Sequence, residues 1–185
     1  MAPYPPYFDS PMFANMNNPV YDLYIYITTP ETFHGFIMPL VLSVALAYNY
    51  RRYLSTTLLF ALFMSMVLAW NTSYMGHTGL HTFPVEYFVL GLLIWKNEPF
   101  TIALAYPFSF FTALSSDVIN GLLHPANAFW YTWYYGIGGA GFHDGLFVDP
   151  LYGVVAVLLV YGAKNLNTLV SGANFKWNVA LFGKL

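Results

Sequence analysis

The sequence predicts an all-α fold: a polytopic transmembrane helix bundle over residues 31–185, preceded by an extended, Pro- and aromatic-rich N-terminal arm over residues 1–30. Composition is the first reason. Of the 185 residues, 58% are hydrophobic and 8% are charged, whereas a typical soluble domain has about 25% charged residues. So few charges cannot cover so much apolar surface in water. The second reason is that apolar stretches alternate with basic and histidine-containing ones, as in a chain that crosses a bilayer repeatedly.

The same composition argues against several classes of protein. The formal net charge is −2 and no basic tract is present, so a nucleic-acid partner is not expected. The chain has no cysteine, which excludes disulfides, iron–sulfur clusters and thiolate metal sites. No internal repeat relates its two halves, and the sequence gives no support for an inverted-repeat transporter.

The N-terminal arm cannot form a continuous helix, because prolines interrupt it at Pro3, Pro5, Pro6, Pro11, Pro19 and Pro30. The arm is also richer in aromatic residues than a solvated disordered tail. We expect it to lie extended across an external protein or membrane surface, and a loose terminus is the alternative.

Apolar runs predict five helices. The first is expected over 34–50, ending before Arg51 and Arg52, and the second over 54–73. The third is expected over 80–95.

The fourth helix is expected to begin at Pro99, a favoured first helical position, and to run to about residue 119. The last is expected over 150–170, opening at Pro150, with Lys164 near its inner end. Several of these helices are shorter than the ~20 residues that a bilayer core requires, so they are expected to tilt or to be shielded by neighbouring protein.

Residues 126–142 can be interpreted in two ways, because the segment is strongly aromatic and ends in a glycine-rich stretch. A sixth spanning helix here would place Lys164, Lys176 and Lys184 outside. An external amphipathic or re-entrant element keeps them inside, as the positive-inside rule favours. We therefore expect five spans, with the N-terminus outside and the C-terminus in the cytoplasm.

In this topology the basic residues and the histidines lie on opposite sides of the membrane. The six basic residues fall at cytoplasmic helix ends: Arg51, Arg52, Lys96, Lys164, Lys176 and Lys184. The five histidines fall at the external ends together with three aspartates: His34, His77, His81, His124, His143, Asp117, Asp144 and Asp149. This segregation predicts a functional site near the external surface.

A metal site is one hypothesis for this external side. His77 and His81 are four residues apart and would share a face if the third helix began there. The full set of candidate ligands is His77, His81, Asp117, His124, His143 and Asp144. Imidazole and carboxylate without thiolate suit copper, zinc or iron, and two histidines can also hold a haem. The alternative is that the histidines are ordinary interfacial residues.

Glu86 is the second candidate. It lies inside the third expected helix, where a buried acid costs ~2.5–3.5 kcal/mol at the membrane centre. At about 100° per residue its side chain is about 140° from that of His81. We therefore expect it to meet a polar group of another helix or to line a proton path, and Asp117 has the same two interpretations.

Four short stretches resemble a known family. They are AspLeuTyrIleTyrIleThr (22–28), TyrAsnTyrArgArgTyr (48–53), Trp70 followed by Phe83-Pro84, and GlyAlaLysAsnLeuAsnThr (162–168). In their order they resemble the membrane A-type subunit of particulate methane and ammonia monooxygenases. The last stretch is similar to the ending of the archaeal members. The resemblance implies a copper enzyme built from several membrane chains. Because the histidine pattern departs from that of the family, no family site is assigned to residues here.

Three functions are compatible with these features. The first is an integral subunit of a multi-subunit membrane oxidoreductase, of copper monooxygenase-like or respiratory type, with lipid and other membrane subunits as partners. The second is a small channel or transporter that uses Glu86 and Asp117. The third is an external-face metal-dependent hydrolase, in which His81, His124, His143 and Asp144 bind a metal that activates water.

Overall fold

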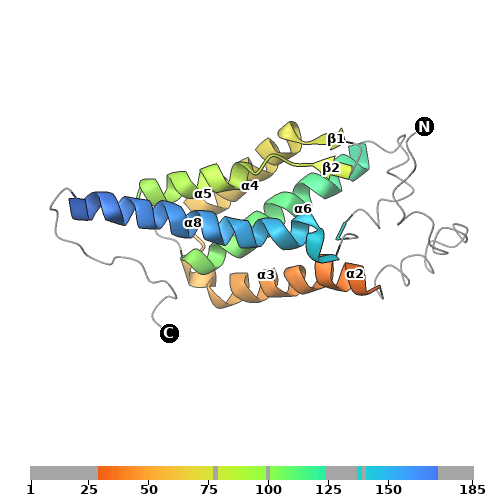
Figure 1. The fold of residues 1–185 in the computed structure, drawn as a ribbon, viewed down its shortest axis with the longest axis horizontal. Helices are drawn as coiled ribbons and strands as arrows, with labels where there is room; N and C mark the ends of the chain where they lie inside the picture. The colour runs from red at the N-terminus through yellow and green to blue at the C-terminus, as the bar shows by residue number, and fades with distance from the viewer. Residues whose placement is uncertain (1–28, 77–78, 99–100, 124–136, 139–140, 171–185) are drawn as a thin grey trace, which may run out of the picture.

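The computed structural model describes residues 29–76, 79–98, 101–123, 137–138 and 141–170. In this part of the chain the main helices run up and down an elongated bundle (Figure 1). The elements are α2 (Pro30–Thr32), η3 (Phe33–Ile37), α3 (Met38–Asn49), η4 (Arg51–Tyr53), α4 (Thr56–Thr72), β1 (Tyr74–Gly76), β2 (Gly79–His81), α5 (Val85–Trp95), η5 (Ile102–Leu104), α6 (Ala105–Leu123), η7 (Gly141–His143) and α8 (Gly145–Val170).

The first helix is continuous from Pro30 to Asn49 and contains a π-helical turn, η3. Its start is defined by Thr29, whose side chain accepts a hydrogen bond from the Thr32 backbone N–H, and by proline at the first helical position. The helix therefore begins four residues before the expected position, His34. The rest of the predicted arm, residues 1–28, lies outside the described residues.

The third helix is shorter than the sequence predicts. Strands β1 (Tyr74–Gly76) and β2 (Gly79–His81) form a two-stranded antiparallel hairpin in which Tyr74 pairs with His81, and α5 starts only at Val85. The expected helix from residue 80 is therefore wrong at its beginning. His81 lies in β2, so the helical spacing that would place it on one face with His77 does not apply. In the described part of the chain, all the other regular elements are helices.

The last helix starts earlier than expected, at Gly145, and Pro150 lies inside it. The expected start of the fourth helix, Pro99, lies outside the described residues. The first elements described after it are η5, which begins at Ile102, and α6, which follows directly. Most of the 126–142 segment also lies outside the described residues. The choice between a sixth spanning helix and an external element therefore stays a prediction.

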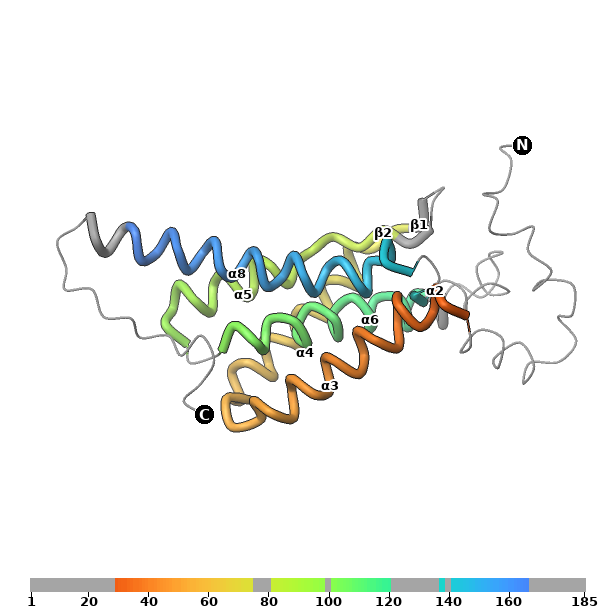
Figure 2. Tube along the Cα trace, turned by 60° about the horizontal axis from the view of Figure 1, so that its bottom comes forward, coloured from red at the N-terminus to blue at the C-terminus, as the bar shows by residue number. Residues whose placement is uncertain are grey.

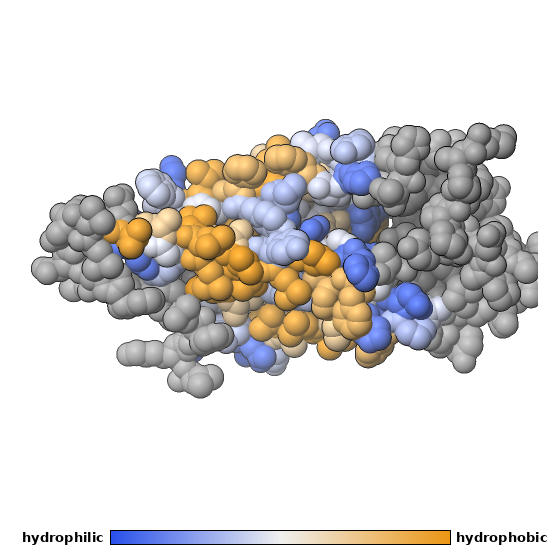
Figure 3. Space-filling view, viewed as in Figure 1, coloured by the Kyte–Doolittle hydropathy of each residue, from blue (hydrophilic) through white to orange (hydrophobic). Residues whose placement is uncertain are grey.

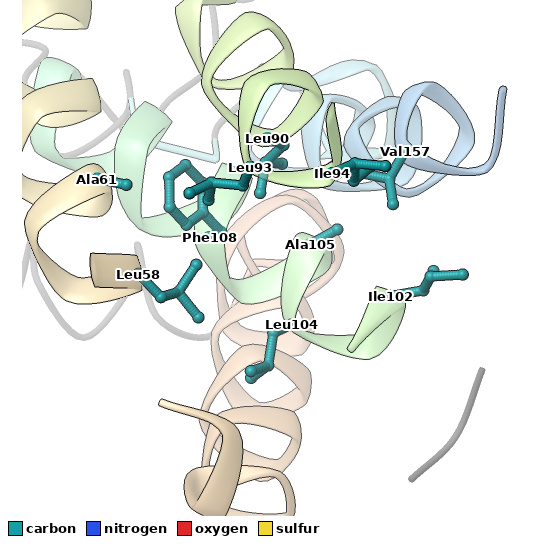
Figure 4. Close-up of a cluster of buried hydrophobic side chains, with 10 residues drawn as sticks. All are labelled: Leu58, Ala61, Leu90, Leu93, Ile94, Ile102, Leu104, Ala105, Phe108 and Val157. Carbon is teal, nitrogen blue, oxygen red and sulfur yellow. The ribbon is translucent and has the colours of Figure 1, made fainter. Parts of the chain in front are cut away.

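Helix α6 occupies the centre of the bundle and packs against α3, α4, α5 and α8 (Figure 2). The larger core cluster joins α4, α5, η5, α6 and α8 through Leu58, Ala61, Leu90, Leu93, Ile94, Ile102, Leu104, Ala105, Phe108 and Val157 (Figure 4). A second cluster connects α6 with the start of α8 and with Ile137.

The outer helix faces are apolar. Among the described residues, three helical segments are long and apolar enough to cross a membrane: Pro30–Asn49, Ile102–Asn120 and Gly145–Leu166. Helices α4 and α5 are apolar but shorter. Apolar side chains cover much of the middle of the molecule, and the strongly hydrophilic ones gather toward its ends (Figure 3). The structure thus agrees with a membrane protein in which Pro30–Asn49 and Gly145–Leu166 are open to lipid and Ile102–Asn120 is largely enclosed by other helices.

Candidate functional site

The two ends of the bundle carry different charges. One end, formed by η4 and by the junction of α5 with α8, holds the four described basic residues: Arg51, Arg52, Lys96 and Lys164. The opposite end holds the hairpin, η3 and η7, and with them the three described histidines: His34, His81 and His143 (Figure 1). The predicted segregation is therefore confirmed for the described residues. His77, His124, Lys176 and Lys184 lie outside them.

The described histidines have different surroundings. The His34 ring lies against Phe142, with 4.3 Å between the ring centroids, and the His81 ring stacks on Tyr74 at 5.2 Å. Both His81 and His143 are exposed. Rings packed on aromatic neighbours near a bundle end match the alternative interpretation of these residues as interfacial side chains.

The predicted metal ligands do not assemble in the described part of the chain. No group of three or more His, Cys, Asp or Glu side chains there is arranged to hold a metal ion. Asp144 caps the start of α8, where its Oδ1 accepts a hydrogen bond of 3.0 Å from the Leu146 backbone N–H. Thus His81, Asp117, His143 and Asp144 do not fit a copper, zinc or iron centre among themselves. The other two candidates, His77 and His124, lie outside the described residues.

Carboxylates gather at the histidine end instead. Asp117 of α6 interacts electrostatically with Asp144 and Asp149, at the start of α8. Glu86 of α5, whose side chain is 2% exposed, interacts with Asp149 in the same way. The carboxylate of Asp149 on α8 is thus near enough to act on Glu86, and a direct polar contact of Glu86 with another helix stays a prediction.

Tyr87 of α5 connects this acidic region to the contact between α6 and α8. Its hydroxyl donates a hydrogen bond of 3.0 Å to the Asp149 carbonyl and so ties α5 to α8. One turn further along α8, Gly153 lies directly against the Ser109 hydroxyl of α6. Ser109 is completely buried, and its Oγ has no hydrogen-bond partner.

A hydroxyl network joins the hairpin to α6, and it was not predicted from the sequence. The Ser73 and Ser116 hydroxyls are 2.5 Å apart, and Thr82 donates to Ser116 over 3.3 Å. Asn120 donates to both the carbonyl and the hydroxyl of Ser116. One signal was available: buried polar residues recur at helical spacing along α6, at Ser109, Thr112, Ser116 and Asn120.

At the basic end, Lys164 holds the end of α5. Its Nζ donates to the carbonyls of Ile94 at 2.5 Å and Trp95 at 3.2 Å, and to Oδ1 of Asn97 at 2.5 Å. These carbonyls are among the last of the helix, which have no partners within the helix itself. The lysine thus compensates for the early end of α5.

Comparison with protein-family models, with curated proteins and with solved structures finds no match for this chain. Function is therefore argued from the residues and their arrangement.

Proposed function

We propose that this chain is an integral membrane subunit of a multi-subunit membrane oxidoreductase, of copper monooxygenase-like or respiratory type. The observation that carries the subunit role is the short helix α5 with an uncovered aromatic surface beside it. The oxidoreductase class is supported by the family resemblance of the four short stretches.

Helix α5 is too short to cross a bilayer. Its 11 residues extend about 16 Å at 1.5 Å per residue, about half of a ~30 Å hydrocarbon core. The hairpin that precedes it packs along α6 through Ser73, Thr82 and Ser116. Non-helical backbone at such a depth is tolerated only where protein or a water-filled cavity covers it. A covering partner is thus expected.

The side chains around the hairpin match such a partner. Tyr74, Phe83 and Phe88 are 65%, 52% and 66% exposed, and His81 is exposed beside them. We call these four residues the hairpin surface. The rings of Phe83 and Phe88 stack at 6.1 Å, which gives a rigid aromatic contact area. Aromatic residues are enriched at protein–protein interfaces.

The positive-inside rule gives the orientation in this proposal. The end with Arg51, Arg52, Lys96 and Lys164 faces the cytoplasm, and the hairpin surface lies on the external side. The first helix starts at the external end, so the N-terminus is placed outside and the C-terminus in the cytoplasm.

Photo-crosslinking tests the partner contact. The chain has no cysteine, so Phe88→Cys gives a unique attachment point for a benzophenone maleimide. Phe60→Cys on α4, which is 64% exposed, is the matched control. In native membranes we expect the label at position 88 to capture a protein chain and the label at position 60 to capture lipid. Lipid capture at both positions would contradict the subunit role.

Purification in a mild detergent tests the oxidoreductase class. We expect a stable larger assembly, with the partner chains identified by mass spectrometry and a redox metal, copper first, detected by elemental analysis. A monodisperse monomer would count against the assembly, and an intact assembly without a redox metal or haem would count against the oxidoreductase. Because no described group of residues fits a metal, no catalytic step is assigned to this chain.

A channel or transporter is the second candidate, favoured by the electrostatic interaction of Asp149 with both Glu86 and Asp117 inside the bundle. Reconstituted in liposomes, the chain would then conduct protons or cations. Glu86→Gln and Asp117→Asn would abolish that flux, whereas Glu98→Gln, at the basic end, would not. Liposomes that show no flux with the unmodified chain would eliminate this candidate.

A further inference from the structure

The basic end of α3 combines an apolar groove with two arginines. The groove is shallow and open, has a volume of about 510 Å³, and is lined by α3 alone, through Leu40, Val41, Val44, Ala45 and Tyr48. These positions recur every four residues, so they share one face of α3. Its walls are apolar, and Tyr48, at its end, reaches the turn that carries Arg51 and Arg52.

Arg51 is held at the mouth of this groove. Its guanidinium carbon lies 4.4 Å from the centre of the Tyr48 ring, and its Nη1 donates a hydrogen bond of 3.0 Å to the Tyr48 carbonyl. Arg52 stands over Tyr53 in a similar way, at 5.0 Å. Both arginines are exposed. A guanidinium has five N–H donors, and the bond to Tyr48 uses one of those of Arg51.

The turn fixes these orientations from inside. Tyr50 and Tyr53 pack against the larger core cluster. The Tyr53 N–H donates to the Tyr50 carbonyl at 2.9 Å, and the Leu54 N–H donates to the Arg51 carbonyl at 3.1 Å. With the two tyrosines directed inward, the two arginines between them are directed outward. The cation at the groove mouth is therefore pre-organised by the fold.

We infer that this feature binds one anionic phospholipid, with an acyl chain in the α3 groove and the phosphate on Arg51 and its neighbour Arg52. The charge pattern favours a lipid as the occupant. The apolar groove has cations at one end only, and a lipid has its charged headgroup at one end of its apolar chains. The guanidinium fork matches phosphate geometry and can bind it through two parallel hydrogen bonds. Basic residues at the cytoplasmic face attract anionic lipids. The inference depends only on membrane insertion, and not on the identity of the assembly.

Quenching by brominated lipids tests the site. The full chain with Val44→Cys carries a bimane label in the groove and is reconstituted with brominated phosphatidylglycerol or brominated phosphatidylcholine. We expect the relative binding constant at this position to favour phosphatidylglycerol by roughly five-fold for each arginine. Arg51→Gln with Arg52→Gln should remove the preference, and Lys96→Gln, at the same end but away from the groove, should leave it unchanged.

Two further measurements keep the test independent of misfolding. A label at Val155→Cys on α8 should show no preference between the lipids, and added salt should weaken the preference at position 44. Equal binding constants at position 44, or a preference that survives the double substitution, would overturn the inference. Absence of quenching by either lipid would also overturn it, since a protein then covers the groove.

Discussion

Gly153 marks the closest approach of α6 and α8. A side chain at this position would meet the Ser109 hydroxyl, with the Ser109 Cβ only 3.0 Å away and the Tyr87 ring at 3.6 Å. Small residues at helix crossings allow backbones to approach closely in membranes. Gly162, on the same helix, has nothing within 4 Å of the corresponding position. A close helix contact therefore requires glycine at position 153 but not at position 162, although both lie in similar apolar sequence.

Gly153→Ala should destabilise the bundle by about 1–3 kcal/mol, the usual cost of overpacking a tight core. Gly162→Ala is the control and should cause no loss, because alanine favours helix. Thermal unfolding in detergent, followed by circular dichroism, measures both. Adding Ser109→Ala should recover part of the loss, since the unpaired hydroxyl is the nearest obstacle. Equal stability of the two glycine variants would contradict this account.

Lys164 is a structural residue in spite of its position in an apolar helix. Lys164→Met should lower the free energy of unfolding by about 1–2 kcal/mol, at the lower end for hydrogen bonds to charged groups because the side chain is partly exposed. The carbonyls of Ile94 and Trp95 would lose the lysine as a donor, although the Ile94 carbonyl still accepts from the Asn97 backbone N–H. Lys96→Met removes an exposed cation instead and should change stability little. The same unfolding measurement distinguishes them, and similar losses would be inconsistent with a specific clamp.

At the residue scale the sequence predicted charge placement better than chemistry. The basic and histidine ends were predicted correctly for the described residues because the membrane sorts charges along a single axis. The four described members of the metal set, His81, Asp117, His143 and Asp144, form no ligand group, because ligation depends on distances across helices that no spacing along the chain specifies. The complete set stays a prediction. Asp144 shows the difference: a carboxylate next to a histidine is occupied in capping α8.

The hairpin is the element that sequence periodicity missed. His77-Thr-Gly-Leu-His81 has helical spacing of its histidines, but glycines at positions 76 and 79 flank the turn and favour it over a helix. Tertiary contacts complete the choice, since Ser73 and Thr82 on either side of the hairpin both reach Ser116. The long apolar runs were placed well because length and hydropathy alone define them.

Ser116→Ala should loosen this element. The substitution removes the hydroxyl shared by Ser73, Thr82 and Asn120, at a cost of about 0.5–1.5 kcal/mol for a lost hydrogen bond. The cost stays in this range because Ser73 keeps its bonds to the Ala69 carbonyl and to Thr82, and Asn120 keeps its bond to the Ser116 carbonyl. Hydrogen exchange of residues 73–82 should become faster. The neighbouring Ser115→Ala is the control, because the Ser115 hydroxyl bonds only the Thr112 carbonyl of its own helix. The same exchange rates in both variants would show that the network does not hold the hairpin.

For the whole molecule, the two ends of the bundle are expected to face different compartments. His143→Cys should react with a membrane-impermeant maleimide applied from outside intact cells, and Lys96→Cys should react only after the membrane is opened. Both positions are exposed and belong to opposite ends. If only Lys96→Cys reacted from outside, the orientation would be the opposite of the one proposed. Reaction of both would mean that the bundle does not cross the membrane as proposed.

The central position of α6 has a consequence for biosynthesis. Among the three long apolar segments it is the one most enclosed by its neighbours, and its inward side carries serine, threonine and asparagine. The ribosome delivers this helix before α8, which covers a large part of that side. Until α8 emerges, the Ser109 hydroxyl, against which Gly153 of α8 packs, has lipid or the insertion machinery beside it in place of that helix. Nascent chains that stop short of Gly145 should consequently be retained at the translocon or degraded by quality-control proteases.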